Sequence, residues 1–432
     1  MLLIYSEKES PRLRYIAKQL FERILGTRVS ITHKPEEFID FNGAKFSYGK
    51  QPLENELFFQ SSDLLFEQGV NEDLITIRDW DGIPCFYLAP HPDSAIPFDV
   101  FAASFYMLTR YEEYLPQVKD EFGRFMATSS LAYQHNFLKT PVVDLWAQRI
   151  KKILKNRFPE IIWKPRKFEV ELICEVNEAF AYYKKGWFRT IEGLIYDVWN
   201  LKFSKLLNRV KVLLGLMKDP FHTYNYMINT ARKNNANLRV FFGLGNYSNH
   251  EKSTNRHSYT YQKLIKSIAD YCSIGMRLSY DAQNNLENFK EEKKRFEQIT
   301  HRPASYTFCQ YSRINLPNTY RTLVEQEVTV DYSMGYQDYA GFRAGTSVPF
   351  LFYDLDYEIQ TPLNIVPFCL SKNMFNNISS SEKGIEEVNT LISFIQNVKG
   401  KAVIHIQNDM FDETEVRVSF WKTMYSYFVT LS

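Results

Sequence analysis

The residues that could do chemistry in this sequence are few and scattered. Its eight histidines form no HxH, HxxH or HxxxH pair, the spacings expected of a metal site. The five cysteines form no CxxC pair, so neither a disulfide framework nor a zinc knuckle is indicated. No GxSxG elbow, P-loop or GxGxxG loop occurs. These patterns point to no metal cluster, activated serine or phosphate-binding loop.

Three single residues remain as candidates. His405 stands two residues before Gln407 in a predicted strand, so both side chains face the same side of it. We expect His405 to be packed in the core, with a role in a relocated metal site as the alternative. Cys174 and Cys309 fall at the ends of predicted strands, where alternation points each thiol away from its polar neighbour. We predict that both are buried and inert rather than nucleophilic.

Composition excludes several classes of protein. The chain has 52 basic and 50 acidic residues, a net charge of +2, so it lacks the charge to attract nucleic acid. The amino terminus has too short an apolar run for a signal peptide. The most apolar later stretch, residues 94–108, is too short to span a bilayer. We therefore expect a cytoplasmic protein without a transmembrane segment.

The length of the chain predicts two domains to position any site, because 432 residues are more than one hydrophobic core accommodates. Two prolines and a cluster of charges in NRFPEIIWKPRK place the boundary after a predicted helix at 143–154. Residues 1–160 predict an α/β domain that opens with the strand MLLIYS and a helix at 13–24. Residues 166–432 alternate strands with helices, which predicts a distorted (β/α) barrel of about seven parallel strands. Barrels carry their chemistry at the carboxyl ends of the strands.

Several long stretches carry a family resemblance. Those of the second domain resemble bacterial polysaccharide (carbohydrate) deacetylases of the NodB-like class, and those of the first resemble the domain upstream of them in glycan-assembly loci. The resemblance covers nearly the whole chain, and it implies a barrel of the polysaccharide-deacetylase type that hydrolyses an N-acetyl group on a sugar with zinc. The stretches are NEAFAYYKKGWFR, KDPFHTY, VFFGLG, LIKSIADYCSIGMRLSY, LPNTYRTLVEQEVTVDYSMGY, GFRAGTSVPFLFYDL, LTRYEEYLP, GRFMATSSLA and FLKTPVVDLWA.

The positions that the resemblance assigns to metal and acid–base groups are replaced in this chain. Glu175 and Asn177 stand where the family has an Asp-x-Asp pair, and Arg277, Gln310 and Gln407 stand where it has histidines. A glutamine does not shuttle protons near neutral pH, and a guanidinium repels a divalent cation. We predict that the chain binds no zinc or other cofactor. We also predict that Arg277 takes the metal's place and pairs with Glu175.

We therefore expect a catalytically impaired deacetylase homologue, a pseudoenzyme. It would bind a glycan or N-acetylated sugar, or act as the structural partner of another protein in a glycan-assembly system. The alternative is an active carbohydrate N-deacetylase with a displaced metal site, or with a metal-free mechanism that uses Glu175 as base. The predicted ligand-contacting residues are Tyr280, Phe308, Tyr311, Arg343 and Asn408.

Two further features leave alternatives open. Arg343 and Asp331 match family residues near the expected cleft, where they would either hold loops or bind sugar. A basic helical insertion at residues 188–218 interleaves leucine and valine with lysine and arginine. It would either lie on an anionic membrane surface or pack over the barrel mouth with a solvated basic face.

Overall fold

The computed structural model describes residues 1–183, 187–248 and 258–432, so His250 and His257 lie outside the described ranges. The described chain divides into two compact units, each assembled from separate stretches of sequence. The first unit comprises Met1–Glu169, Ile314–Cys369 and Thr390–Ala402; the second comprises Val170–Arg313, Leu370–Asn389 and Val403–Ser432. The boundary expected between residues 160 and 166 stays a prediction.

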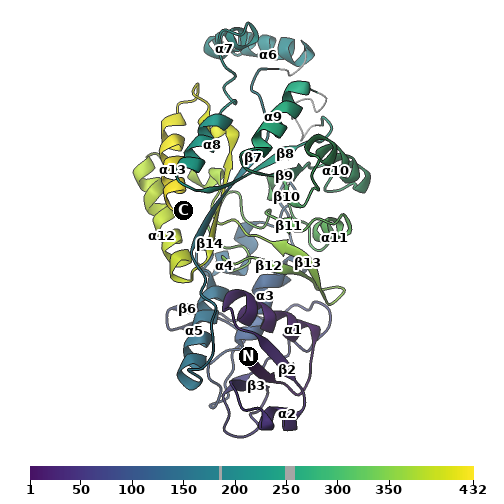
Figure 1. Cartoon of the computed structure of the whole chain (residues 1–432), viewed down its shortest axis with the longest axis vertical. Helices are drawn as coiled ribbons and strands as arrows, with labels where there is room; N and C mark the ends of the chain where they lie inside the picture. The colour runs from purple at the N-terminus through teal and green to yellow at the C-terminus, as the bar shows by residue number, and fades with distance from the viewer. Residues whose placement is uncertain (184–186, 249–257) are drawn as a thin grey trace. The chain divides into compact units, whose positions relative to one another are not determined.

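The first unit begins with a parallel sheet (Figure 1). Its central strand is continuously apolar and buried along its length, the pattern of a strand covered on both faces. Aromatic side chains pack beside the sheet, where the Phe46 and Phe59 ring centroids lie 4.9 Å apart. In the described residues the strand order is β2-β1-β3-β4. The strands are β1 (Leu2–Tyr5), β2 (Val29–Thr32), β3 (Lys45–Gly49) and β4 (Phe58–Gln60).

The first helix starts at a side-chain cap. Ser10 Oγ accepts a hydrogen bond from the backbone N–H of Leu13 at 3.0 Å, and Pro11 occupies the first helical turn. α1 (Pro11–Ala17) continues directly into a π-helix (Lys18–Ile24), so the helix predicted at 13–24 is confirmed with a change of type. The other helices and short strands of this unit are α2 (Pro35–Asp40), α3 (Val100–Thr109), α4 (Leu131–Gln134), α5 (Val142–Arg157), α11 (Asn318–Glu325), β5 (Arg78–Trp80) and β6 (Ile83–Cys85).

The larger sheet confirms the predicted fold class. It is a curled, mostly parallel α/β half-barrel whose described strands follow the order β12-β13-β11-β10-β9-β8-β7-β14. β7, β8, β9 and β10 run parallel to one another, while β12 is antiparallel to β13. Their bounds are β7 (Glu169–Val176), β8 (Asn237–Gly243), β9 (Ser273–Leu278), β10 (Tyr306–Cys309), β11 (Val330–Asp331), β12 (Phe350–Asp354), β13 (Ile359–Ile365) and β14 (Lys401–Gln407).

Helices separate the parallel strands of the second unit along the chain, as the alternating pattern predicts. The start of α10 is fixed by a side-chain cap. Oδ1 of Asn285 accepts hydrogen bonds from the backbone N–H groups of Glu287 and Asn288. The helices are α6 (Trp187–Trp199), α7 (Phe203–Leu213), α8 (Tyr224–Lys233), α9 (Tyr259–Ala269), α10 (Leu286–Thr300) and α13 (Val418–Thr430), together with α12 (Ser381–Asn397), whose residues from Thr390 on belong to the first unit. Within the described ranges, every helix is too short or too polar to span a membrane. The expected cytoplasmic location stays a prediction.

Candidate functional site

The carboxyl ends of neighbouring strands in the second unit bring the predicted site residues together. In the parallel register, Gly243 of β8 lies opposite Arg277 of β9, which in turn lies opposite Phe308 of β10. Glu175 lies one residue before the end of β7, and Gln407 ends the neighbouring β14. Parallel strands end at one edge of a sheet, so residues far apart in sequence meet there.

The Glu175 carboxylate is the centre of this site. Its side chain is 3% exposed, and its Oε2 atom lies 3.2 Å from Nε2 of His405 and accepts a hydrogen bond from Nε2 of Gln407 at 3.3 Å. His405 is buried in the core, as expected, and it also takes part in the site through this contact. A role of His405 in a relocated metal site stays a prediction.

These contacts fix the protonation state of Glu175. Burial alone would raise the pKa of its carboxyl. The hydrogen bond and charge of His405, the charge of Arg277 and the hydrogen bond from Gln407 together hold that pKa below its ordinary value of 4.5. The carboxylate is therefore ionised near neutral pH. A general base works best with a pKa near the working pH, so this environment makes Glu175 a weak one.

Arg277 lies in the same interior, and a glycine makes room for it. The side chain is fully buried, and a Cβ built on Gly243 would lie 2.3 Å from its Nη2 atom. Its positive charge is one of the causes that lower the pKa of Glu175. The expectation that a guanidinium stands in for the metal's charge stays a prediction, as does the direct pairing of Arg277 with Glu175.

Aromatic rings lie next to the polar site. Phe308 is fully buried, and its ring stacks on the imidazole of His405 at 4.8 Å between centroids, while Phe241 packs against it at 5.7 Å. A Cβ on Gly275 would lie 2.4 Å from the Phe241 ring, so this glycine admits the ring. Phe308 was expected to contact a sugar; that contact would require these rings to separate.

Gln310 and the two predicted tyrosines lie just beyond β10 and β9. The side chain of Gln310 is buried, and its Oε1 accepts a hydrogen bond from the backbone N–H of Tyr280 at 2.8 Å. The rings of Tyr280 and Tyr311 are half-buried with centroids 6.4 Å apart. The guanidinium of Arg313 lies 4.8 Å from the Tyr280 centroid. These partly exposed rings can contact a ligand.

The two predicted asparagines differ in exposure. Asn408 is 1% exposed, and its Nδ2 donates to the carbonyl of Glu178 at 2.9 Å and to the hydroxyl of Tyr224 at 3.3 Å. These contacts tie the segments after β14 and β7 together. Asn177 is half-buried in the bend that follows β7. Asn408 thus holds the edge of the site in this structure, and its contact with a sugar stays a prediction.

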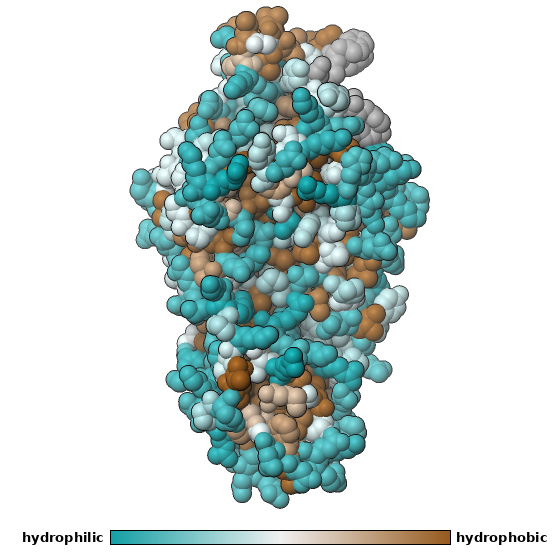
Figure 2. All heavy atoms as spheres, in the orientation of Figure 1, coloured by the Kyte–Doolittle hydropathy of each residue, from teal (hydrophilic) through white to brown (hydrophobic). Residues whose placement is uncertain are grey.

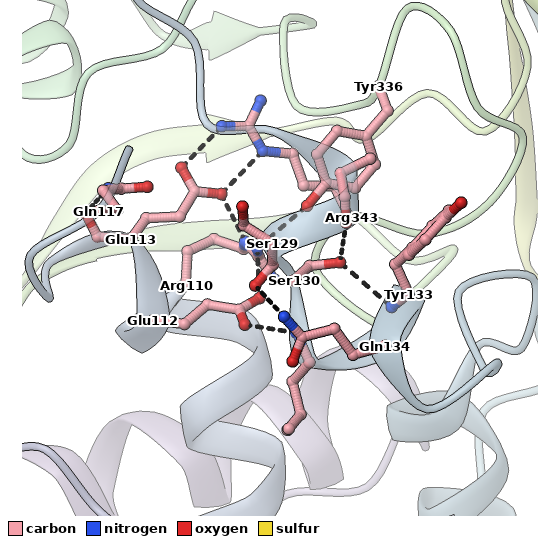
Figure 3. Close-up of polar contacts among 12 residues, drawn as sticks. Arg110, Glu112, Glu113, Gln117, Ser129, Ser130, Tyr133, Gln134, Tyr336 and Arg343 are labelled. Carbon is pink, nitrogen blue, oxygen red and sulfur yellow. Dashed lines mark hydrogen bonds and ion pairs between the residues drawn. The ribbon is translucent and has the colours of Figure 1, made fainter. Parts of the chain in front are cut away.

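Arg343 and Asp331 lie in the first unit, whereas the other predicted site residues lie in the second. Arg343 is 2% exposed, and its Nε and Nη2 atoms donate to the two oxygens of Glu113 at 2.8 and 2.6 Å. Arg110 also donates to Glu113 through its Nε at 2.8 Å, so two guanidinium groups share one carboxylate (Figure 3). Nη1 of Arg343 donates to the carbonyl of Gly335 at 3.3 Å. These contacts match the loop-holding alternative, and a contact with sugar stays a prediction.

Asp331 also makes loop contacts. Its carboxylate is fully buried and accepts hydrogen bonds from the backbone N–H and the hydroxyl of Ser333, both at 2.8 Å. A carboxylate that accepts from the residue two positions on stabilises a turn. The contacts therefore support the role of Asp331 in holding its own segment.

The donor set around Glu175 does not fit the zinc ion that the sequence resemblance implies. Zinc sites use three or four anionic or imidazole ligands, whereas one carboxylate and one imidazole meet here beside the guanidinium charge of Arg277. Cys174 supplies no ligand, because its thiol lies 3.9 Å from the sulfur of Met227 on α8 and burial raises its pKa well above the ordinary value. In the described part of the chain, no group of three or more His, Cys, Asp or Glu side chains could hold a metal ion.

A cavity of about 480 Å³ lies beside residues that follow β7 and β14. Lys372 connects it to the buried carboxylate: its Nζ donates to Oδ2 of Asp409 at 2.7 Å and to Oε1 of Gln407 at 3.2 Å. Gln407 in turn donates to Glu175. The lining combines charged side chains with aromatic rings and includes Glu178, Tyr182, Arg209, Lys372, Asp409 and Trp421.

The sequence reasoning missed these lining residues. Asp409 follows Asn408 directly at the end of β14, so the rule that barrel sites lie at strand ends could have found it. Lys372 comes from a 3-10 turn (Lys372–Phe375) that is 35 residues from Gln407 and has no motif. Only the folded chain brings Lys372 to the cavity.

Comparisons with known proteins add a distant likeness. A family model described as a family of unknown function, DUF7033, matches residues 2–159. No curated protein matches the sequence. Among solved structures, a Mycobacterium smegmatis protein assigned as a polysaccharide deacetylase has a TM-score of 0.38 and 11% identity, over 62% of this chain and 86% of that one. A Pseudomonas aeruginosa PAO1 protein with the same assignment has a TM-score of 0.37 and 10% identity, over 61% and 85%. Puue allantoinase has a TM-score of 0.37 and 9% identity, over 62% and 85%. The chain is thus distantly similar in structure to polysaccharide deacetylases.

Proposed function

We propose that this chain is a catalytically impaired polysaccharide-deacetylase homologue that binds a carbohydrate without hydrolysing it. The observation that carries the proposal is the state of Glu175. Its carboxylate is almost fully buried and bonded to His405 and Gln407, with the charge of Arg277 nearby. Hydrolysis of an amide needs an activated water and a polarised carbonyl. A buried carboxylate that is bonded to His405 and Gln407, with a guanidinium charge nearby, is poorly placed to bind a divalent cation or to activate a water.

The cavity beyond β7 and β14 supports carbohydrate binding. Sugars present hydroxyl groups that both donate and accept hydrogen bonds, and their apolar faces pack on aromatic rings. Lys372 and Asp409 offer a donor and an acceptor at the cavity wall, and the rings of Tyr182 and Trp421 lie in the same lining. A volume of about 480 Å³ falls in the ordinary range for small-ligand sites. The half-buried rings of Tyr280 and Tyr311 would contact further sugar units of a longer glycan.

Binding of a defined sugar tests the proposal. Titration calorimetry with tetra-N-acetylchitotetraose should give binding to the wild-type protein, and Lys372→Ala should weaken it about tenfold through the loss of charge-assisted hydrogen bonds. Lys290→Ala is the matched control, because Lys290 pairs with Glu287 on the exposed face of α10. The same mixture should release no acetate. Equal weakening by both variants would contradict the placement of the sugar in this cavity.

The second candidate function is an active carbohydrate N-deacetylase that uses Glu175 as base. The observation in its favour is the 3.2 Å contact between Glu175 and His405, since a hydrogen-bonded imidazole and carboxylate can move a proton between them. Multiple-turnover acetate release from the same oligosaccharide, abolished by Glu175→Gln, would establish this candidate and overturn the first.

In a structural version of the first proposal, the chain binds another protein. A homologue that keeps the fold and loses the chemistry can still position an active enzyme or its glycan in a glycan-assembly system. This form predicts that the chain co-purifies with an active deacetylase or a glycan-assembly enzyme while showing no turnover of its own.

A further inference from the structure

Two helices of the second unit form a hairpin with an unusual distribution of side chains. α6 (Trp187–Trp199) and α7 (Phe203–Leu213) pack on each other and are drawn at the top of Figure 1. They correspond to the basic insertion seen in the sequence. We call these two helices, with the turn that joins them and the segment to Lys218, the α6–α7 hairpin.

The outer side of α6 is apolar and exposed. Ile191, Ile195 and Val198 recur at positions i, i+4 and i+7, which places them on one face of the helix. Their side chains are 47%, 60% and 51% exposed, and the adjacent Trp199 is 85% exposed. Large apolar side chains in such a row normally face a protein core.

α7 repeats the pattern. Phe203, Leu207 and Val210 follow the same spacing, and Leu214 continues the row one turn later. All four are exposed, Phe203 by 57% and Leu214 by 68%. Figure 2 shows hydrophobic residues gathered over this pair of helices. The hairpin therefore carries two exposed apolar rows.

The inner side of the hairpin holds a buried ion pair together with Val212, which is 4% exposed. Asp197 of α6 and Arg209 of α7 form an ion pair at 2.8 Å, with side chains only 4% and 13% exposed. Gly193 makes this pair possible, because a Cβ there would lie 2.4 Å from Nη1 of Arg209. Lys205 points the same way and pairs with Glu415 at 3.0 Å. A hairpin with charges inside and apolar rows outside requires an apolar surface to cover it.

Charge identifies the kind of surface. Residues 187–218 hold six basic and two acidic side chains, while the whole chain carries a net charge of only +2. The hairpin is thus strongly cationic on a nearly neutral protein. Lys202, Lys211 and Lys218 are exposed beside the apolar rows. A second copy of the chain would bring the same positive charge to the contact, which argues against self-association.

We propose that the α6–α7 hairpin docks the protein on an anionic lipid surface. The apolar rows would enter the boundary between headgroups and acyl chains, and the lysines would lie against lipid phosphates. Basic residues combined with Trp, Phe and Leu on an exposed helix face are typical of helices that lie in this layer. Such docking would hold the cavity of the second unit near a lipid-linked glycan, but it does not depend on carbohydrate binding.

Vesicle flotation tests the proposal. The full chain should float with vesicles of phosphatidylcholine that contain phosphatidylglycerol, and it should not float with phosphatidylcholine alone. Added salt should weaken the binding, because it screens charges at the membrane surface. Failure to float with the anionic vesicles at low salt would overturn the proposal, and so would equal binding to both kinds of vesicle.

Variants locate the contact. The double variant Leu207→Asp and Leu214→Asp should lower the vesicle partition coefficient about tenfold or more, because two positions of the apolar row on α7 become charged. Lys202→Glu with Lys211→Glu should lower it roughly fivefold or more for each residue. Ile162→Asp is the matched control, since Ile162 is 82% exposed in the first unit and should leave partition unchanged.

Circular dichroism and light scattering complete the test. The exposed positions predict unchanged secondary structure in every variant, so a loss of vesicle binding reports on the surface itself. A monomeric wild-type protein supports lipid as the occupant. A stable dimer that the Leu207→Asp and Leu214→Asp variant dissociates would overturn the proposal in favour of a second copy of the chain.

Discussion

Two buried glutamates, one in each compact unit, are held in different ways. Glu113 of the first unit accepts hydrogen bonds from two guanidinium groups, those of Arg343 and Arg110, at 2.6 to 2.8 Å. Glu175 of the second unit is bonded by an imidazole and an amide at 3.2 and 3.3 Å. Both carboxyls have a pKa below the ordinary value in spite of burial.

The difference separates two kinds of buried charge. The Glu113 network joins segments that are more than 200 residues apart in the chain through short, charge-assisted bonds, as a structural tie does. Glu175 stands near the end of β7, is linked through Gln407 to Lys372 at the wall of a cavity, and is held by longer bonds. We infer that Glu113 serves the fold, whereas Glu175 belongs to the candidate site at the strand ends.

The largest expected effect on stability comes from changing Glu113, which two guanidinium groups share. Glu113→Gln should lower the free energy of unfolding by about 3–5 kcal/mol, because two buried guanidinium groups then share a neutral amide. Urea denaturation measures this change. Glu9→Gln is the control, since its pair with Arg14 is exposed and contributes about 0–1 kcal/mol. Similar losses of unfolding free energy in Glu113→Gln and Glu9→Gln would contradict a structural role for the Glu113 network.

Glu175→Gln should cost less, about 1–3 kcal/mol in the same experiment. The amide oxygen can still accept hydrogen bonds from His405 and Gln407, so the main loss is the attraction of the carboxylate for the surrounding positive charge. A loss as large as that of Glu113→Gln would show that both sites are equally strong ionic ties.

Gly243→Ala probes the space that Arg277 occupies. The added methyl group would lie 2.3 Å from Nη2 of the fully buried Arg277, so the guanidinium would have to shift within the interior, and we expect a loss of about 1–3 kcal/mol in unfolding free energy. Gly49→Ala is the matched strand glycine, because the nearest atom to its Cβ is 3.8 Å away. Equal stability of the two variants would argue against a guanidinium at this position.

The smallest expected effect is the pH dependence of the stability that Glu175 contributes. The folded-state pKa of Glu175 lies below its ordinary value of 4.5, so the ionised carboxylate contributes stability above about pH 4.5 that is lost as the pH falls through the lowered pKa. The stability difference between wild type and Glu175→Gln should therefore shrink between pH 7 and pH 3 in urea titrations. A difference that grows toward low pH would mean that the pKa is raised instead.

The fold was largely predictable from the sequence because strands and helices alternate so regularly. The pair β12–β13 was not predicted, since four residues rather than a helix connect Asp354 to Ile359, and the alternating pattern gives no signal for an antiparallel pair. The strand-end rule correctly brought Glu175, Arg277 and Gln407 into one neighbourhood.

The partners of those residues could not be predicted in the same way. The contact of His405 with Glu175 was not predicted, because alternation gives the side that a residue faces but not the atoms that it reaches. The burial of Phe308 between Phe241 and His405 depends on the register of several strands. Lys372 reaches Gln407 from a distant turn, and no local pattern marks such a contact.

The most direct test of the account is a calorimetric titration of the metal-free protein with zinc. The account predicts no binding at micromolar zinc, because one carboxylate and one imidazole beside the buried charge of Arg277 do not form a zinc site. Tight one-to-one binding that Glu175→Ala abolishes would contradict the claim that protein side chains have taken the place of the metal.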